Sequence, residues 1–439
     1  MKGKLSKKYG NIYSLQFCWN NVVVLNGFQA IKEALVKKSE DFADRPILPL
    51  YKVFGYRDSS EGLVFARYDK TWKEQRRFAL TTLRNFGMGK KSVEEQIGEE
   101  AMYLCRGFQN EKGKPFDPKA RIVNAVANVI CSIVFGDRVH YTDPDFVELV
   151  ELFEEDFKLE AEKITQIMNV FPWTSSIPGP HQRLFTVTRL INNKLQKIVD
   201  QHKETRNPAV KRDFIDAFLE EIEKANDQDS SFNESNLVFT TIDLFAAGME
   251  TTTMSLYWAL LFMVVYPDIQ RKVHEEIDSV LGKEKKPTSE DRINMPYTDA
   301  VIHETLRYGN IAPTSLPHRA FRDTEVLGYF IPKGTTVFVN LSSALFDETI
   351  WEKPYEFIPE HFLSTDGQVI KHEAFIPFSM GRRICLGEQL AKTELFIFFT
   401  SLMQCFKIKL PEGEPAPSLE GVVALTRSPH PYKICAEPR

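Results

Sequence analysis

One stretch of this chain constrains its fold more than any other, because it has the pattern of a single, unusually long helix. The stretch runs from about Asn236 to Tyr266, Asn233 or Ser235 can cap its start, and Pro267 ends it. Roughly 31 residues at ~1.5 Å each make a rod on the order of 46 Å long. Such a rod crosses a whole domain, so the rest of the chain must pack around it.

The apolar part of this stretch is too short to cross a bilayer. Its longest uninterrupted apolar run, Leu256 to Tyr266, has 11 residues, whereas a spanning helix needs about 20. The basic start Met1–Lys8 is not followed by the apolar stretch of a signal peptide. We therefore expect the long helix to be a buried spine, and we expect no segment of this chain to span a membrane.

Composition is that of a large globular protein. The 439 residues are 43% hydrophobic and 26% charged, close to globular averages. With 55 basic and 60 acidic residues the net charge is −5, so nucleic acid is not an expected partner. The six cysteines have no Cys-x-x-Cys spacing, which argues against zinc sites and disulfide frameworks and favours a reducing compartment.

Helical periodicity dominates, with short strands near both ends of the chain. Ile12–Phe17 and Val22–Leu25 predict a hairpin, Thr324–Ile331 and Thr335–Asn340 predict strands, and Leu386–Phe406 predicts a last helix. We expect a mainly α fold in one domain, 1–439, with a small sheet built from both chain ends. The β-rich part is expected at about 1–60 and 315–345, and the helical part at about 66–310 and 386–406.

The densest chemical signal is the segment Phe378–Gly387, which reads Phe-Ser-Met-Gly-Arg-Arg-Ile-Cys-Leu-Gly. Its two glycines allow a tight turn around Cys385, and a helix start together with Arg383 favours the thiolate. Such a thiolate is either a nucleophile or a metal ligand. A nucleophile needs a histidine base, and His372 has no recognisable orienting partner. A ligand of haem iron accounts for more of the segment, because Arg383 can pair with a haem propionate while Phe378 packs beside the sulfur.

The spacing Phe-x-x-Gly-x-Arg-x-Cys-x-Gly resembles the haem-binding signature of the cytochrome P-450 superfamily at every fixed position. The resemblance implies the fold of that family, haem b as cofactor and Cys385 as the axial ligand of its iron. Trp351–Pro354 and the tail Cys435–Arg439 look like vertebrate microsomal members of family two, nearest to the D-type subfamily. Those proteins begin with a membrane anchor that is not found here. We therefore expect a truncated form, held peripherally on the cytoplasmic side of the endoplasmic reticulum membrane.

A second element of the family lies within the long helix, in Ala247-Gly248-Met249-Glu250-Thr251-Thr252. Small residues beside an alcohol and a carboxylate are poor choices for uniform helix packing. By resemblance, this helix passes over the distal face of the haem, and Gly248 leaves room for dioxygen. Thr251 and Glu250 are then the catalytic residues that relay protons. A Thr251 hydroxyl bonded within its own helix is the alternative.

Two further groups take their roles from the resemblance. Trp72 and Arg76, one helical turn apart, are expected to bind the haem propionates together with Arg383 and His318; for Trp72 a packed aromatic is the alternative. The second group is structural. It is a buried ion pair, Glu304 with Arg307, joined by His361, where many members carry arginine, so the charge of this triad is left open.

Asp243 precedes Thr251 by eight residues, a little over two helical turns, so both can face one pocket together with Ala247. Glu160 lines the same pocket if the helix around 157–168 covers it. We expect the two acids to attract a cationic amine. For Asp243, hydrogen bonding to nearby backbone is an equal alternative.

Electrons must come from a partner, because the chain has no Gly-rich dinucleotide motif. By resemblance the partner is an acidic NADPH–cytochrome reductase, with a cytochrome b-type protein as a second donor, docked on a basic face. The residues predicted for this face are Lys73, Arg77, Arg84, Lys90, Lys91, Arg382 and Lys392. The proline-rich segment Phe171–Pro180 is either a buried loop or a contact with the membrane surface.

These inferences converge on an NADPH-dependent haem-thiolate monooxygenase. It is expected to hydroxylate or dealkylate small lipophilic substrates such as xenobiotics, drugs, fatty acids or steroids. A haem-thiolate isomerase or dehydratase is an alternative that needs no proton relay. A haem-binding sensor or carrier is another, and it leaves both the relay and the basic face unexplained.

Overall fold

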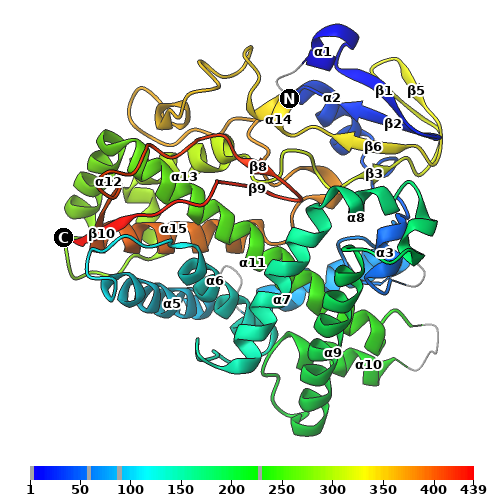
Figure 1. Cartoon of the computed structure of the whole chain (residues 1–439), viewed down its shortest axis with the longest axis horizontal. Coiled ribbons are helices and arrows are strands. Elements are labelled where there is room, and N and C mark those ends of the chain that lie inside the picture. Colours follow the sequence, from blue (N-terminus) through cyan, green and yellow to red (C-terminus); the bar gives the residue numbers. More distant parts are fainter. Residues whose placement is uncertain (1–3, 57–60, 87–90, 226–229) are drawn as a thin grey trace.

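The computed structural model describes residues 4–56, 61–86, 91–225 and 230–439, and one helix, α11 (Glu234–Val265), organises its core. Asn233 caps this helix, since its Oδ1 accepts from the backbone N–H of Asn236 at 2.9 Å. α11 runs through the centre of the molecule (Figure 1) and its second half is almost completely buried. The predicted spine is therefore confirmed.

Pro267 begins the next helix, α12 (Pro267–Val280), and the chain bends there by 107°. Among the residues that the structure describes, no single helix is long and apolar enough to cross a bilayer. α11 and α12 meet that criterion only when taken together as a bent pair.

Two groups of helices pack around α11. The first contains α5 (Lys91–Gln109), α6 (Lys119–Val134), α13 (Pro296–Gly309) and α15 (Glu388–Cys405). The second contains α7 (Pro144–Ala161), α9 (Gln182–Thr205) and α10 (Phe214–Lys224). The other helices are α1 (Lys4–Tyr9), α2 (Phe28–Lys32), the π-helix η1 (Glu33–Lys37), α3 (Pro49–Val53), α4 (Lys70–Asn85), α8 (Lys163–Met168), η2 (Pro172–Ser176), η3 (Ser289–Asn294), α14 (Ser342–Leu345), η4 (Pro359–Phe362) and η5 (Gly381–Arg383).

The largest sheet lies to one side of the helices (Figure 1) and has the order β1-β2-β6-β3. Its strands are β1 (Ile12–Phe17), β2 (Asn20–Leu25), β3 (His318–Arg319) and β6 (Thr336–Val339). β1 and β2 form the predicted antiparallel hairpin, and β2 runs parallel to β6 with Val22 opposite Thr336. The sheet thus joins the start of the chain to a segment about three hundred residues later.

The C-terminal tail does not join that sheet. β10 (Cys435–Pro438) pairs with β7 (Phe406–Lys409) in a sheet of its own, and β8 (Val422–Val423) pairs with β9 (Arg427–Ser428). The prediction of one sheet built from both chain ends is therefore wrong for the C-terminal end. The reason is local, because α15 continues directly into β7 and so offers the tail a strand edge beside its own helix.

The predicted strand over Thr324–Ile331 is also two strands, β4 (Thr324–Val326) and β5 (Tyr329–Ile331), which form a hairpin. The turn residues Leu327 and Gly328 have φ of 49° and 88°. Two consecutive positive φ angles are typical of a two-residue hairpin turn, and leucine is an unusual residue for it. Leu327, at the first position of the turn, is not a typical turn residue. The sequence therefore did not indicate the break between the two strands.

Candidate active site

An internal cavity of about 350 Å³ lies between α11 and the loop that precedes α15. α11 lines it with Asp243, Ala247, Gly248 and Thr251, and the loop lines it with Phe378, Arg383 and Cys385. Thr251 and Cys385 are surrounded by protein yet accessible, since their open surface faces this cavity. The two segments that the sequence singled out therefore meet in one place, although more than one hundred residues separate them.

The loop before α15 is shaped by Gly381, which has φ of +77°. A Cβ atom at this position would lie 1.8 Å from the backbone oxygen of Leu35 in η1, so only glycine fits. Gly387 is different, because its φ of −89° is open to any residue and the nearest atom to a Cβ would be Cys385 Sγ at 4.0 Å. The tight turn that was expected from two glycines thus depends on Gly381 alone.

The electrostatic surroundings of Cys385 differ from the prediction. Burial raises the pKa of its thiol, while the N–H groups of Gly387 and Glu388 and the charge of Arg76 act to lower it. Arg383, predicted as the neighbouring cation, points elsewhere and donates to the carbonyls of residues 43, 63 and 66. The thiol is therefore the favoured form without a metal ion, and a metal ion would have to displace its proton.

Three guanidinium groups gather at one side of the cavity, on Arg45, Arg76 and Arg383. Their partners are backbone carbonyls: Arg45 donates to residues 64, 316 and 317, and Arg76 donates to residue 384 at 2.6 Å. The carboxylate of Asp44 lies beside them, but it forms an ion pair with the Arg67 guanidinium at 2.7 Å. Burial lowers the pKa of all three, that of Arg45 to about 10. This surplus of buried positive charge calls for an anion, and the paired carboxylates of a haem fit it.

Trp72 and His318 were predicted to bind the same propionates, and each has a hydrogen-bond partner within the protein. The indole N–H of Trp72 donates to the Leu63 carbonyl at 3.1 Å, and the Arg383 guanidinium lies 3.9 Å from its ring centroid. Trp72 is also not among the residues that line the cavity, so its contacts position Arg383. His318 lines the cavity, its Nδ1 lies 2.7 Å from the Phe42 carbonyl, and burial holds its pKa well below the usual range.

The predicted relay pair does not share the cavity. The Thr251 hydroxyl lines it and donates to the Ala247 carbonyl at 2.8 Å. The Glu250 carboxyl instead accepts from the Thr426 hydroxyl at 3.0 Å, and burial raises its pKa. At Gly248 a Cβ would lie 2.6 Å from Cδ1 of Ile130, so this glycine also allows α6 to approach α11 closely.

The two predicted substrate acids are both occupied by protein groups. Asp243 accepts from the backbone N–H groups of Leu63 and Val64 at 2.6 and 2.9 Å and from the Tyr56 hydroxyl at 2.9 Å. Burial raises its pKa to about 6. Glu160 does not line the cavity; burial and a hydrogen bond with the Asp156 carboxyl raise its pKa well above the usual range. The geometry therefore favours the backbone-binding alternative for Asp243.

The predicted structural triad lies outside the cavity. Arg307 and Glu304 form a bidentate pair at 2.6 and 2.7 Å with both side chains fully buried. Arg307 also donates to three backbone carbonyls, of residues 345, 354 and 356. His361 Nδ1 lies 3.3 Å from Glu304, and its Nε2 faces the Glu352 carbonyl. Both ring nitrogens thus face oxygen atoms of neighbouring groups.

Comparison with known proteins decides the family. The model of the family described as "Cytochrome P450" matches residues 3–436. The chain is similar to cytochrome P-450 2D15 of Canis lupus familiaris (48% identical), 2D14 of Bos taurus (49%) and 2D6 of Homo sapiens (48%). Each match covers 99% of this chain and 88% of the relative.

The chain belongs to the cytochrome P-450 family. Its cofactor is haem, and it is a monooxygenase of the microsomal type that acts on xenobiotics. A reductase and small lipophilic substrates are its partners, and its 2D relatives are proteins of the endoplasmic reticulum. The mainly α fold that the sequence predicted is confirmed.

The predicted basic face of this cytochrome P-450 is only partly free. Lys73, Arg77 and Arg84 are exposed on α4. Arg382 is paired with Glu40 at 2.7 Å, and Lys392 with Glu388 at 2.6 Å. Lys90, and the side chain of Lys91, lie outside the described residues.

Sequence reasoning missed two residues that line the cavity. Arg45 is buried there, and its only signal was a charged pair, Asp44 and Arg45, in front of a proline. Glu394 of α15 is buried with one oxygen lacking a partner among the described residues, and burial raises its pKa well above the usual range. An acid within the apolar sequence of this helix was a visible signal.

Proposed function

We propose that Cys385 is the axial ligand of the haem iron and that Arg45, Arg76 and Arg383 receive the haem propionates. The observation that carries this proposal is the surplus of buried positive charge beside an accessible sulfur in one cavity. Hydrogen bonds between guanidinium groups and carboxylates are strong in such surroundings. Trp72 is then a positioning residue, because its ring supports the guanidinium of Arg383.

A bound haem would provide the site at which dioxygen is activated with electrons from the reductase, so that one oxygen atom enters the substrate and the other is reduced to water. The apolar residues of α11 and α6 along the cavity, among them Leu244, Ala247 and Ile130, bind a lipophilic substrate and exclude water. Thr251 holds a hydroxyl at the cavity surface, where it can pass a proton. Glu250 keeps its proton to higher pH than an exposed carboxyl, because it is buried. To return a proton to the Thr251 hydroxyl, the Glu250 carboxyl must turn away from Thr426.

Reconstitution of the holoenzyme with reductase and NADPH tests the catalytic proposal. We expect NADPH and dioxygen to be consumed in step with hydroxylated or dealkylated product. Replacing Cys385 by alanine should abolish both the characteristic absorption of the haem and turnover, whereas the same change at the exposed Cys18 should preserve them. Product without NADPH consumption would indicate an isomerase or dehydratase. Haem binding without any product would indicate a sensor or carrier.

For the reductase, we propose a docking face centred on Lys73, Arg77 and Arg84 of α4. This choice is supported by their exposure and by the pairing of Arg382 and Lys392 with carboxylates. Reductase affinity should fall as salt rises. Arg77→Glu should weaken it further, while Arg271→Glu on α12, an equal change of charge, should not. Affinity that is independent of salt would contradict this face.

We also propose that the segment around η2 contacts the membrane surface. Trp173 is 65% exposed, Ile177 is 45% exposed, and Trp19 of the β1–β2 turn adds a further exposed ring beside Phe171. Exposed apolar side chains of this size favour an interface with lipid. Flotation with liposomes should therefore recover this chain, and Trp173→Ser with Ile177→Ser should reduce recovery. The proposal fails if neither form floats.

A further inference from the structure

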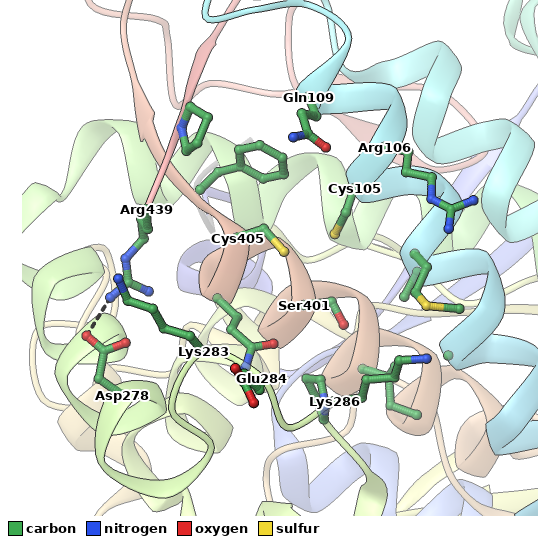
Figure 2. A pocket seen from close by; sticks show the side chains of 18 residues that line it. Cys105, Arg106, Gln109, Asp278, Lys283, Glu284, Lys286, Ser401, Cys405 and Arg439 are labelled. Atoms are coloured by element: carbon green, nitrogen blue, oxygen red, sulfur yellow. Dashed lines mark hydrogen bonds and ion pairs between the residues drawn. The ribbon is translucent and has the colours of Figure 1, made fainter.

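A second pocket, of about 640 Å³, lies between α5 and the C-terminal half of α15. It shares no lining residue with the cavity beside Cys385. Two cysteines from different helices lie next to each other on its wall, Cys105 from α5 and Cys405, the last residue of α15 (Figure 2). Both are free thiols; Cys405 is exposed and Cys105 half-buried. The pocket therefore gives solvent access to a pair of sulfur atoms.

The two thiols interact, and the interaction makes them unequal. A hydrogen bond joins the two thiols, and this bond and burial raise the pKa of Cys105 well above the usual range. The same hydrogen bond, opposed by burial and assisted by the Arg439 guanidinium, lowers the pKa of Cys405 to about 7. A thiol whose pKa lies near the ambient pH is the best attacking group in thiol–disulfide exchange. Cys405 is also the more exposed of the two sulfurs, so an external disulfide reaches it first. Cys405 is thus the nucleophile of the pair, and Cys105 is the resolving thiol.

The charged side chains around the pocket determine which disulfide reagents are attracted to these sulfurs. Four cationic side chains line it, against two acidic ones; these residues are Arg106, Lys283, Lys286 and Arg439, with Asp278 and Glu284. Asp278 is already paired with Arg439 at 2.7 Å (Figure 2). The remaining charge is positive and attracts anions.

We propose that Cys105 and Cys405 form a redox-active dithiol that reacts with small anionic disulfides of the glutathione type. The Cys405 thiolate attacks one sulfur of the external disulfide, whose S–S bond breaks, and the departing thiolate takes up a proton. The mixed disulfide on Cys405 is then attacked by the sulfur of Cys105, which gives its proton to solvent, and the second external thiolate leaves and is protonated. One disulfide is reduced to two thiols, and the cysteine pair is oxidised to one disulfide.

The product would be a covalent link between α5 and the C-terminal end of α15. Helix α15 begins three residues after Cys385. The disulfide would therefore fix the C-terminal end of the helix whose N-terminal end follows the Cys385 loop. This inference does not depend on the proposed roles of the haem-site residues, because it concerns different side chains and a different pocket.

The test compares two disulfides on the haem-loaded protein, oxidised glutathione, which is anionic, and cystamine, which is cationic. Mass-spectrometric peptide mapping follows each cysteine, and the exposed Cys18 serves as the reference thiol. The hydrogen bond with Cys105 lowers the pKa of Cys405 toward the ambient pH, where a thiol attacks disulfides most effectively. We expect oxidised glutathione to modify Cys405 faster than Cys18. We expect the ratio of Cys405 to Cys18 modification to be several-fold lower with cystamine.

The wild-type protein should yield a peptide cross-linked through Cys105 and Cys405. Cys105→Ser should stop the reaction at a glutathione adduct on Cys405, and Cys405→Ser should leave Cys105 unmodified. Equal selectivity for the two disulfides would overturn the role of the pocket charges. An adduct on Cys405 that persists in the wild-type protein, or no reaction at Cys405 while Cys18 reacts, would overturn the dithiol itself.

Discussion

Replacement of Asp243 separates its two interpretations, a support for nearby backbone and an anchor for a cationic substrate. Asp243→Ala leaves three donors without an acceptor, namely the N–H groups of Leu63 and Val64 and the hydroxyl of Tyr56. Each buried donor that loses its partner costs about 1–3 kcal/mol. The expected loss is therefore at least about 3 kcal/mol, a large part of a total stability of about 5–15 kcal/mol.

Asp243→Asn is the matched variant. Its Oδ1 can accept from both N–H groups as the present Oδ2 does, and its amide N–H can donate to Tyr56, so the expected loss is only about 1 kcal/mol. It also removes a pH dependence. Burial raises the pKa of Asp243 to about 6, so the folded protein holds this proton more tightly than the unfolded chain. Stability should therefore fall as pH rises from about 4 to about 6, by about 3 kcal/mol.

Urea unfolding of the holoenzyme at pH 4 to 7, followed by circular dichroism, measures these differences. Binding of basic and neutral substrates, followed by the optical shift of the haem, is measured on the same samples. We expect Asp243→Ala to weaken both substrate classes and Asp243→Asn to flatten the pH dependence. If Asp243→Ala unfolds like the wild type and only basic substrates bind more weakly, the backbone role is wrong and the anchoring role is right.

Two further predictions concern residues around the site. Glu304→Ala should lower the free energy of unfolding in urea by about 3–5 kcal/mol, because it leaves the buried Arg307 guanidinium without its carboxylate partner. In the control, Glu275→Ala removes the partner of the exposed Arg271 and should cost less than about 1 kcal/mol. Similar losses for both variants would refute the structural role of Glu304. Gly381→Ala should prevent haem incorporation, measured as haem per protein, since its Cβ would meet a backbone oxygen at 1.8 Å; a normal haem content would show that the loop adapts.

Local signals explain which parts of the fold the sequence reveals. α11 begins and ends within two residues of its prediction, because an asparagine cap and Pro267 act on their own neighbours. The hairpin β1–β2 is recognisable for the same reason. The turn at Leu327 is not, since a leucine with positive φ has no composition signal. The pairing of β10 with β7 depends on where α15 delivers the chain, which is a property of the whole fold.

The candidate active site shows the same difference between features with a local sequence signal and features that depend on the whole fold. Spacing alone singles out Cys385, and the cavity brings it together with Thr251. The direction of a side chain is harder to predict than its position in the sequence. Arg383 lies two residues from the cysteine and yet donates to carbonyls of residues 43, 63 and 66, while Arg76 supplies the charge instead. Arg45 was missed because its place beside the cavity depends on contacts with residues 316 and 317, far along the chain.

The contact between Gly381 and Leu35 has a consequence for the order in which the molecule matures. These residues are separated by most of the chain, so the loop that presents Cys385 cannot take its shape until the first and last thirds have met. Contacts between such distant residues are slow to form. Haem should therefore be captured late, by a chain that has been fully synthesised, and an incomplete chain leaving the ribosome should not retain it.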